Sequence, residues 1–456
     1  METKIQTLFS TVHTLLMSQQ FKIEHRANPQ NFIRQRTLGF TDIVLLQLHL
    51  LVKSLSVEVE KALSLLSKPV HYTKQAFSKA RKKLRYTAFV ALNKHFIEQY
   101  YALSTFRLYK KQYLLLAVDG SLLQLPVSQT IDTYFGGWKN QSEKSMPMAR
   151  CSLIYDLLNH MVITSEIASC TTSENQLYYT HLAFLQSFDR HYFSPKPVYI
   201  MDRNYASTKR MLELSLAGNW YVIRCKSNFC KQVKDFIASK QTQSQLRIPL
   251  QTKPHLTSYL NSLFLTNPSL VNNPSLVPTH LITRIVRIGL TTGEDEYLVT
   301  NTDWPMEELA HLYQLRWGIE SYYRLLKEKM QLENFASKTV EGIKQEFFAK
   351  IFASNLVSVL ITEAQSQIDQ QANQKQQLFH KQTKYSYRIN QNVAIGLIKD
   401  HLLLFLLNPT IYMVDYQQLI ERIKKYKIPW RPGRTFPRPR QKSSRRKFPT
   451  HKRSGL

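Results

Sequence analysis

Two short apolar runs that each end in an aspartate set the strongest limit on how this chain can fold. Tyr113–Val118 is followed at once by Asp119, and Val198–Met201 is followed at once by Asp202. Apolar runs of this length are typical of strands that are buried within a sheet. In open α/β sheets, functional sites lie where such strands end. The pattern predicts an α/β fold with both aspartates at strand ends, although either Asp taken alone could be a turn residue.

A third acidic residue belongs to a segment with four polar side chains at helical spacing, namely Tyr313, Arg316, Glu320 and Lys327. At about 100° of rotation per residue, the four side chains fall within a stripe roughly 60° wide. Leucine and isoleucine residues follow an adjacent stripe, so the helix can bury one face and present the polar row at the edge of a cleft. The alternative is an ordinary solvated helix face with ion pairs.

Together, Asp119, Asp202 and Glu320 suggest a metal centre. Carboxylate oxygens on rigid elements are the ligands that a two-metal phosphoryl-transfer site requires. We therefore predict that these three residues are both the catalytic residues and the metal ligands. The expected cofactor is a pair of Mg²⁺ ions, for which Mn²⁺ can substitute.

The same motifs resemble those of the DDE transposases of insertion-sequence family four. The helical segment matches the family's Y-(2)-R-(3)-E-(6)-K signature at every spacing, and Asp119-Gly-Ser and Asp202-Arg-Asn-Tyr-Ala-Ser resemble its other two acidic motifs. The family usually has Gly where Asn204 stands, and Asn tolerates a left-handed backbone better than most residues. The resemblance extends roughly from Phe77 to Phe405.

The resemblance implies a bacterial enzyme that moves its own insertion sequence by metal-dependent DNA cleavage and strand transfer, with cut-and-paste transposition through hairpin ends. It also implies that Tyr313, Arg316 and Lys327 bind phosphates near the cut. In relatives an aromatic residue holds a flipped base; Trp220 and Trp304 are available here, but core packing is the favoured role for both.

Other functional classes remain open. A metal-dependent DNA nuclease without strand transfer would share the three acids. A catalytically silent DNA-binding protein derived from a transposase would have lost them, and all three are present. A basic RNA-binding protein is disfavoured because no stacking motif is apparent.

The order of predicted elements fits a ribonuclease-H-like core. A strand ending at Asp119 is followed by a hairpin, a helix and the strand ending at Asp202, and Glu320 comes from a later helix. The segment between Asp202 and Glu320 is too long for a plain crossover, so we expect an inserted β-rich subdomain. The expected regions are a helical DNA-end-binding domain (1–105), the first part of the core (106–207), the β-rich insertion (208–302), the catalytic helix (303–335), a helical region (336–420) and a basic disordered tail (421–456).

Positive charge predicts a nucleic-acid partner. The chain has 61 Lys and Arg against 32 Asp and Glu, a formal net charge of +29. In the N-terminal region, a helix, a break at Ser67-Lys-Pro69 and a basic helix suggest a helix-turn-helix-like DNA reader, with Lys74, Arg81 and Lys82 as DNA contacts. The alternative is a basic solvated face on an ordinary helical bundle. We expect terminal inverted repeats and target DNA, both double-stranded, as partners, and a homodimer in the DNA complex.

The compartment is predicted to be the bacterial cytoplasm, in association with the nucleoid. No secretory signal is apparent, and the most apolar runs are far shorter than the roughly 20 residues that span a bilayer. The four cysteines fit a reducing compartment, and Cys225 and Cys230 lack the second pair that a zinc site would need.

Overall fold

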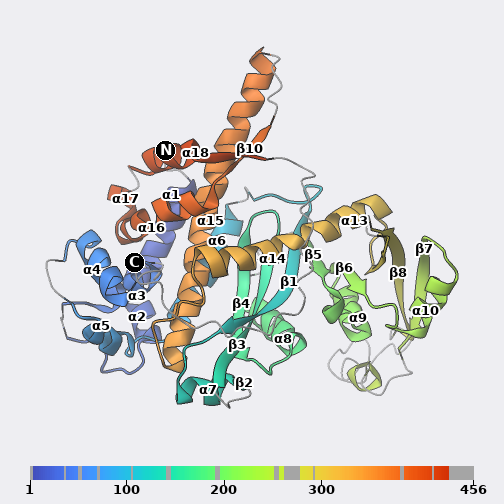
Figure 1. The fold of residues 1–456 in the computed structure, drawn as a ribbon, viewed down its shortest axis with the longest axis horizontal. Helices are drawn as coiled ribbons and strands as arrows, with labels where there is room; N and C mark the ends of the chain where they lie inside the picture. Colours follow the sequence, from blue (N-terminus) through green and yellow to red (C-terminus); the bar gives the residue numbers. More distant parts are fainter. Residues whose placement is uncertain are drawn as a thin grey trace.

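One large sheet with helices around it organises the molecule (Figure 1). The N-terminal helices gather on one side of the sheet, and the strands β7 and β8 extend it on the other. The computed structural model describes residues 4–34, 37–49, 54–68, 72–103, 106–139, 145–189, 196–250, 256–260, 278–290, 293–379, 385–412 and 415–430.

The strand that carries Asp119 is β1 (Tyr113–Gln124), which pairs with an antiparallel strand on one side and a parallel strand on the other. The antiparallel neighbour β3 (Ser145–Asp156) forms a hairpin with β4 (Met161–Ser169) and also pairs with the short β2 (Gly137–Lys139). The parallel neighbour β5 (Lys196–Met201) is reached through helix α8 (Glu174–Leu185). The predicted α/β class and the order strand, hairpin, helix, strand are therefore confirmed.

The two aspartates follow the last pair of residues that joins β1 to β5. The parallel register ends at Val118 and Met201, so Asp119 and Asp202 come next on neighbouring strands. The prediction that a strand ends at Asp119 is wrong, because β1 continues to Gln124 on its pairing with β3. The parallel pairing with β5 ends at Val118, and the next four residues of β1 are only half-buried. The length of an apolar run predicts how far a strand is buried, but it does not predict how far the strand continues to pair with a neighbour.

The segment predicted as an inserted β-rich subdomain (208–302) contains strands, and these strands continue the central sheet. Its first strand, β6 (Trp220–Cys225), is parallel to β5, and β9 (Asp295–Thr300), β8 (His280–Gly289) and β7 (Gln243–Pro249) follow in antiparallel order. Two helices, α9 (Thr208–Leu216) and α10 (Lys231–Ala238), lie between these strands in the chain. The sequence Asn-Pro-Ser-Leu-Val occurs twice in this segment, at 267–271 and 273–277, and both copies lie outside the described residues.

The signature segment crosses the sheet as three successive pieces of helix (Figure 1). These are α13 (Met306–Leu315), α14 (Trp317–Arg324) and a π-helical turn, η3 (Leu325–Lys329). The first piece packs on β5, β6 and β8, and the second packs on β1. The segment therefore carries Glu320 across the sheet to the strand that holds Asp119.

A 40-residue helix, α15 (Val340–Phe379), links the sheet to the remaining helices. By length and composition alone it could cross a membrane, but 78% of its apolar window is buried inside the protein, as in a core helix. It packs against α3, α6, α16 and α18 as well as β4.

The N-terminal helices are α1 (Lys4–Met17), α2 (Gln19–His25), α3 (Phe40–Leu48), α4 (Leu55–Leu65), α5 (Lys74–Arg81) and α6 (Thr87–Ala102). The others are α7 (Gln129–Phe135), α16 (Gln391–Leu407), α17 (Pro409–Tyr412) and α18 (Tyr416–Lys425).

The predicted disordered tail is wrong over its first ten residues. Helix α18 continues to Lys425 because Leu419, Ile420 and Ile423 bury an apolar stripe. The strand β11 (Lys427–Trp430) then pairs with β10 (Ser386–Ile389). Residues 431–456, the rest of the predicted tail, lie outside the described residues.

Candidate active site

Asp119 is a half-buried carboxylate whose negative charge is only partly compensated by nearby positive charge. Its pKa is raised to about 7, mainly because burial disfavours the ionised form. The N–H of Gly120, which donates to Oδ1 over 2.9 Å, and the charge of Arg316 oppose this shift. The carboxylates of Glu174 and Glu320 lie near enough to add to it. The chain therefore holds at least three acidic groups near one another at this edge of the sheet.

Asp202 stands where β5 ends and a short 3₁₀ turn, η1 (Arg203–Tyr205), begins. Its Oδ1 accepts a hydrogen bond from the Tyr313 hydroxyl over 3.2 Å. Burial raises the pKa of that hydroxyl, so Tyr313 keeps its proton at neutral pH and acts as a donor. The first residue of the signature thus fixes the orientation of the second predicted acid.

Glu320 is paired with Arg316 one helical turn earlier. A guanidinium nitrogen of Arg316 donates to Glu320 Oε1 over 2.8 Å. The Arg316 side chain is 6% exposed and that of Glu320 is 37% exposed, so the arginine lies beneath the carboxylate. The guanidinium also lies over the rings of Tyr313 and Trp317, at 5.5 and 5.4 Å from their centroids.

The predicted polar row is not a single exposed face. The helix is interrupted at Arg316, and both Tyr313 and Arg316 are buried, so the prediction that the row is presented to a cleft is wrong for these two. Lys327 lies beyond the second interruption, in η3, and its Nζ donates over 2.6 Å to the carbonyl of Leu122 on β1. The row follows the sheet edge from Asp202 towards the far end of β1.

The donor types at this edge fit a divalent cation, since Mg²⁺ and Mn²⁺ take carboxylate oxygens. A half-buried Asp119 with a raised pKa is the kind of group that a cation would stabilise. However, no group of three or more His, Cys, Asp or Glu side chains is arranged to hold a metal ion among the residues that the structure describes. Tyr313 and Arg316 instead each donate to one of the carboxylates.

The predicted DNA contacts of helix α5 divide into two kinds. Lys74 and Lys82 are exposed at the two ends of the helix. The prediction that Arg81 contacts DNA is wrong, because its side chain is 5% exposed and is bound inside the protein. Its guanidinium donates to Glu346, Gln345 and the carbonyl of Gly342, all at the start of α15. The predicted break between α4 and α5 is present.

A fourth acidic residue, Glu174, adjoins Asp119 and was not identified from the sequence. It is the first residue of α8, and its Oε1 accepts from Arg150 over 3.1 Å. The charge of Glu174 acts on Asp119. The sequence offered one indirect indication of its position, because a helix that begins directly after the hairpin has to return towards the central strands. No residue spacing identified Glu174 itself.

Trp220 and Trp304 pack together as expected for core residues. Their rings are stacked with centroids 5.3 Å apart, and Tyr113 lies against both. Trp304 is buried. Among the described residues, neither tryptophan belongs to the set that surrounds the acids.

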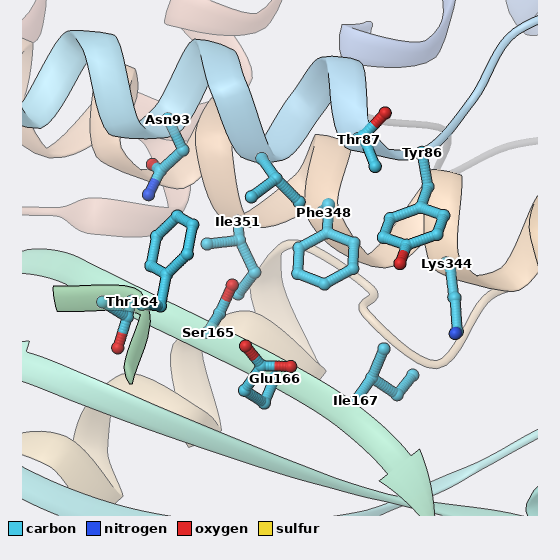
Figure 2. Close-up of a pocket in the computed structure, with 12 residues that line it drawn as sticks. Tyr86, Thr87, Asn93, Thr164, Ser165, Glu166, Ile167, Lys344, Phe348 and Ile351 are labelled. Atoms are coloured by element: carbon cyan, nitrogen blue, oxygen red, sulfur yellow. The ribbon is translucent and has the colours of Figure 1, made fainter. Parts of the chain in front are cut away.

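A cavity of about 220 Å³ lies between α6, β4 and α15, apart from the three predicted acids (Figure 2). Glu166 of β4 faces it, and burial raises the pKa of this carboxyl to about 7 while Lys344 opposes the shift. None of the predicted site residues lines this cavity. A raised pKa therefore does not by itself identify the active site in this protein. Asp119 differs from Glu166 because other acidic side chains lie near it, together with Tyr313 and Arg316.

The matching family model and the sequence relatives indicate one family. The model of the transposase DDE domain matches residues 110–356. The transposase InsG of insertion sequence element IS4 from Escherichia coli (strain K12) is 25% identical over 252 residues, which cover 53% of this chain and 51% of that protein. The transposase of insertion sequence element IS231D from Bacillus thuringiensis subsp. finitimus is 31% identical over 116 residues, which cover 25% of this chain and 21% of that protein. A cryo-EM structure of the piggyBac transposase synaptic complex with hairpin DNA matches with a TM-score of 0.41 and 10% identity, covering 94% of this chain and 84% of that one. The chain thus spans about half of the IS4 relative and about a fifth of the IS231D relative.

Proposed function

Because this chain belongs to the DDE transposases of insertion-sequence family four, we propose that it cuts DNA at the ends of a bacterial insertion sequence and joins those ends to a new target. The observation that carries the proposal is the group of acids at one sheet edge inside the matched domain. Asp202 and Glu320 are held there by Tyr313 and Arg316, and Asp119 lies next to them.

The catalytic domain is proposed to be a ribonuclease-H-like core. In support, the five strands β4, β3, β1, β5 and β6 lie in that spatial order, with an antiparallel hairpin on one side of β1 and parallel strands on the other. Glu320 comes from a later helix that packs on β1. The antiparallel strands beyond β6 are then an extension specific to the segment between Asp202 and Glu320.

The three acids would hold two divalent cations, Mg²⁺ in the cell with Mn²⁺ as a substitute. When bound, such ions activate the attacking oxygen and stabilise the leaving one. The reaction itself breaks one P–O bond and forms another: an attacking water, or later a DNA 3′-hydroxyl, bonds to phosphorus as the leaving oxygen departs with a proton. No covalent bond to the protein is needed. Attack by a 3′-hydroxyl on the opposite strand would produce the hairpin end.

The protein's own side chains have separate tasks in this scheme. The Tyr313 hydroxyl orients Asp202, and the Arg316 guanidinium, which stacks on two aromatic rings, orients Glu320. Arg316 remains close enough to the acids to bind a phosphate oxygen when DNA enters. Lys327, held by the Leu122 carbonyl, would contact the DNA backbone further along β1.

The N-terminal helices are proposed to recognise the terminal inverted repeats. Support comes from the exposed Lys74 and Lys82 on α5, beside a groove of about 770 Å³ between α4 and α5 that Lys74 helps to line. The proposal extends to a homodimer in the DNA complex, with the protein acting at the nucleoid in the bacterial cytoplasm. A net charge of +29 suits both the repeats and the target DNA.

The test is cleavage and joining of DNA that carries the element's own ends. We expect the purified protein with Mg²⁺ or Mn²⁺ to release the ends and join them to a plasmid. Asp119→Asn, Asp202→Asn and Glu320→Gln should each abolish cleavage and retain DNA binding in gel shifts. Cleavage without joining would support the nuclease alternative. Undiminished cleavage by any one of the three variants would refute the assignment of that acid.

A further inference from the structure

The Glu174 side chain lies against Gly120, the residue next to Asp119, in the space that a larger side chain at position 120 would fill. If Gly120 carried a Cβ atom, that atom would lie 2.9 Å from Glu174 Cγ and 3.1 Å from its Oε1. Contacts this short are not tolerated without movement. Gly120 does not adopt the left-handed backbone that would otherwise explain a glycine. The residue after Asp119 is therefore small because the Glu174 side chain lies against it.

The Glu174 carboxylate is held in place from two directions. Its own backbone begins α8, where the Ser173 side chain caps the helix by accepting from Gln176. Its Oε1 accepts from Arg150, whose other guanidinium arm donates to the carbonyl of Cys170. Arg150 lies on β3, opposite Leu122 of β1. The pair is thus anchored to the strand next to the one that carries Asp119.

A buried hydroxyl lies at the same place. Tyr205 is fully buried, and the Ser152 side chain lies near enough to act on its hydroxyl, although the two form no hydrogen bond of regular geometry. Burial raises the pKa of this hydroxyl most, and the charges of Glu174 and Asp119 raise it further. Both carboxylates therefore lie near the hydroxyl. A buried hydroxyl with no regular hydrogen bond, close to two carboxylates, is suited to a bound water or ligand oxygen.

We propose that Glu174 is a fourth carboxylate of the active site, which acts with Asp119 on the divalent cation, and that Arg150 is its positioning residue. The inference rests on the proposed function, since it assigns Glu174 to the metal of that reaction. Arg150 balances the glutamate charge when no cation is present. The alternative is that Glu174 and Arg150 form an ordinary ion pair at a helix N-terminus.

Binding of Mn²⁺ by the full-length protein without DNA decides between the two. The free Mn²⁺ signal in electron paramagnetic resonance gives the Kd for Mn²⁺ of each variant. We expect Glu174→Gln to weaken Mn²⁺ binding about 10-fold or more, as loss of a supporting carboxylate does. Asp119→Asn should abolish binding at the same site. Glu213→Gln on α9 is the matched control, because Glu213 pairs with Lys209 and Tyr179 away from the acids.

Gly120→Ala gives a second, independent test. The added methyl should displace Glu174 and weaken Mn²⁺ binding as Glu174→Gln does, and the double variant should be no weaker than either single variant, because both changes remove the same group. Unchanged thermal melts would show that the variants remain folded. Wild-type binding by Glu174→Gln, with binding lost in Asp119→Asn, would overturn this inference alone. Wild-type binding by both variants would instead refute the metal site of the proposed function, and the inference with it.

Discussion

Arg81 and Lys82 are neighbours in one basic segment, yet we predict that one maintains the fold and the other binds DNA. The Arg81 guanidinium makes three hydrogen bonds to the start of α15, including one of 2.6 Å to Glu346. Both members of that ion pair are buried. Lys82 is exposed. The perturbation is Arg81→Met, with Lys82→Met as the matched control, since each removes a charge and retains an unbranched apolar side chain.

The expected cost of Arg81→Met is large. Removal of one partner from a buried ion pair typically costs about 3–5 kcal/mol, because the other charge stays buried without compensation. Glu346 would keep only the hydrogen bonds from the backbone N–H groups of Ala336 and Ser337. At about 2.1 cal/mol/K of unfolding entropy per residue, a chain of 456 residues loses about 1 °C in Tm for each kcal/mol, so we expect a fall of about 3–5 °C. Exposed Lys82→Met should change the stability by no more than about 0.5 kcal/mol.

Thermal melts and DNA gel shifts at several salt concentrations separate the two roles. Lys82→Met should weaken DNA binding and reduce the salt dependence by about one counterion. At temperatures where it is folded, Arg81→Met should retain the wild-type salt dependence. Adding Glu346→Gln to Arg81→Met should recover part of the lost stability, since no buried charge is then left unpaired. A wild-type Tm for Arg81→Met, together with a reduced salt dependence, would refute this reasoning.

Three further changes give distinct outcomes. Burial raises the pKa of Glu166 from 4.5 to about 7, so its ionisation destabilises the fold as pH rises through this window; Glu166→Gln should stabilise the protein by up to about 3 kcal/mol at pH 8 and by little at pH 4.5, as measured by melts at both values. Tyr313→Phe should lower stability by about 1 kcal/mol, through the lost bond to Asp202, but slow cleavage more than tenfold; equal rates for the variant and the wild type in a single-turnover assay would contradict it. Trp304→Ala should cost about 3–5 kcal/mol in denaturant unfolding, because a buried ring of the aromatic core is lost; a cost below 1 kcal/mol would argue against a core role.

The fold could be predicted from the sequence where burial and local order decide it. The apolar runs before Asp119 and Asp202 identified two adjacent strands of the central sheet, because a run of that length has to be buried on both faces. The continuation of β1 past Asp119 could not be predicted. It depends on pairing with β3, and Gly120 and Ser121 interrupt the apolar run directly after Asp119.

The spacing of residues along the chain could not predict which charged side chains are buried. Helical spacing placed Arg316 on an exposed row beside the apolar stripe, and arginine is rarely buried unless it is paired. Its partners are Glu320 one turn away and two aromatic rings, and the interruption of the helix turns it inward. Arg81 lies four residues after the buried Phe77, on the same helix face, but the carboxylate that balances it is 265 residues away in the chain.

These same contacts decide how the N-terminal region can be tested. Glu346 accepts from Arg81 on one side and from the backbone of Ala336 and Ser337 on the other. That backbone belongs to the segment between η3 and α15, so a hydrogen-bonded path joins α5 to the segment that follows the signature helix. Removing residues 1–105 would leave the Glu346 charge unpaired and uncover the face of α15 that packs against α3 and α6. Loss of DNA cleavage after such a truncation would therefore not distinguish failed recognition of the DNA end from a disrupted active site. Exposed single changes such as Lys74→Met and Lys82→Met leave this path intact, and they are the changes that can assign end recognition to α5.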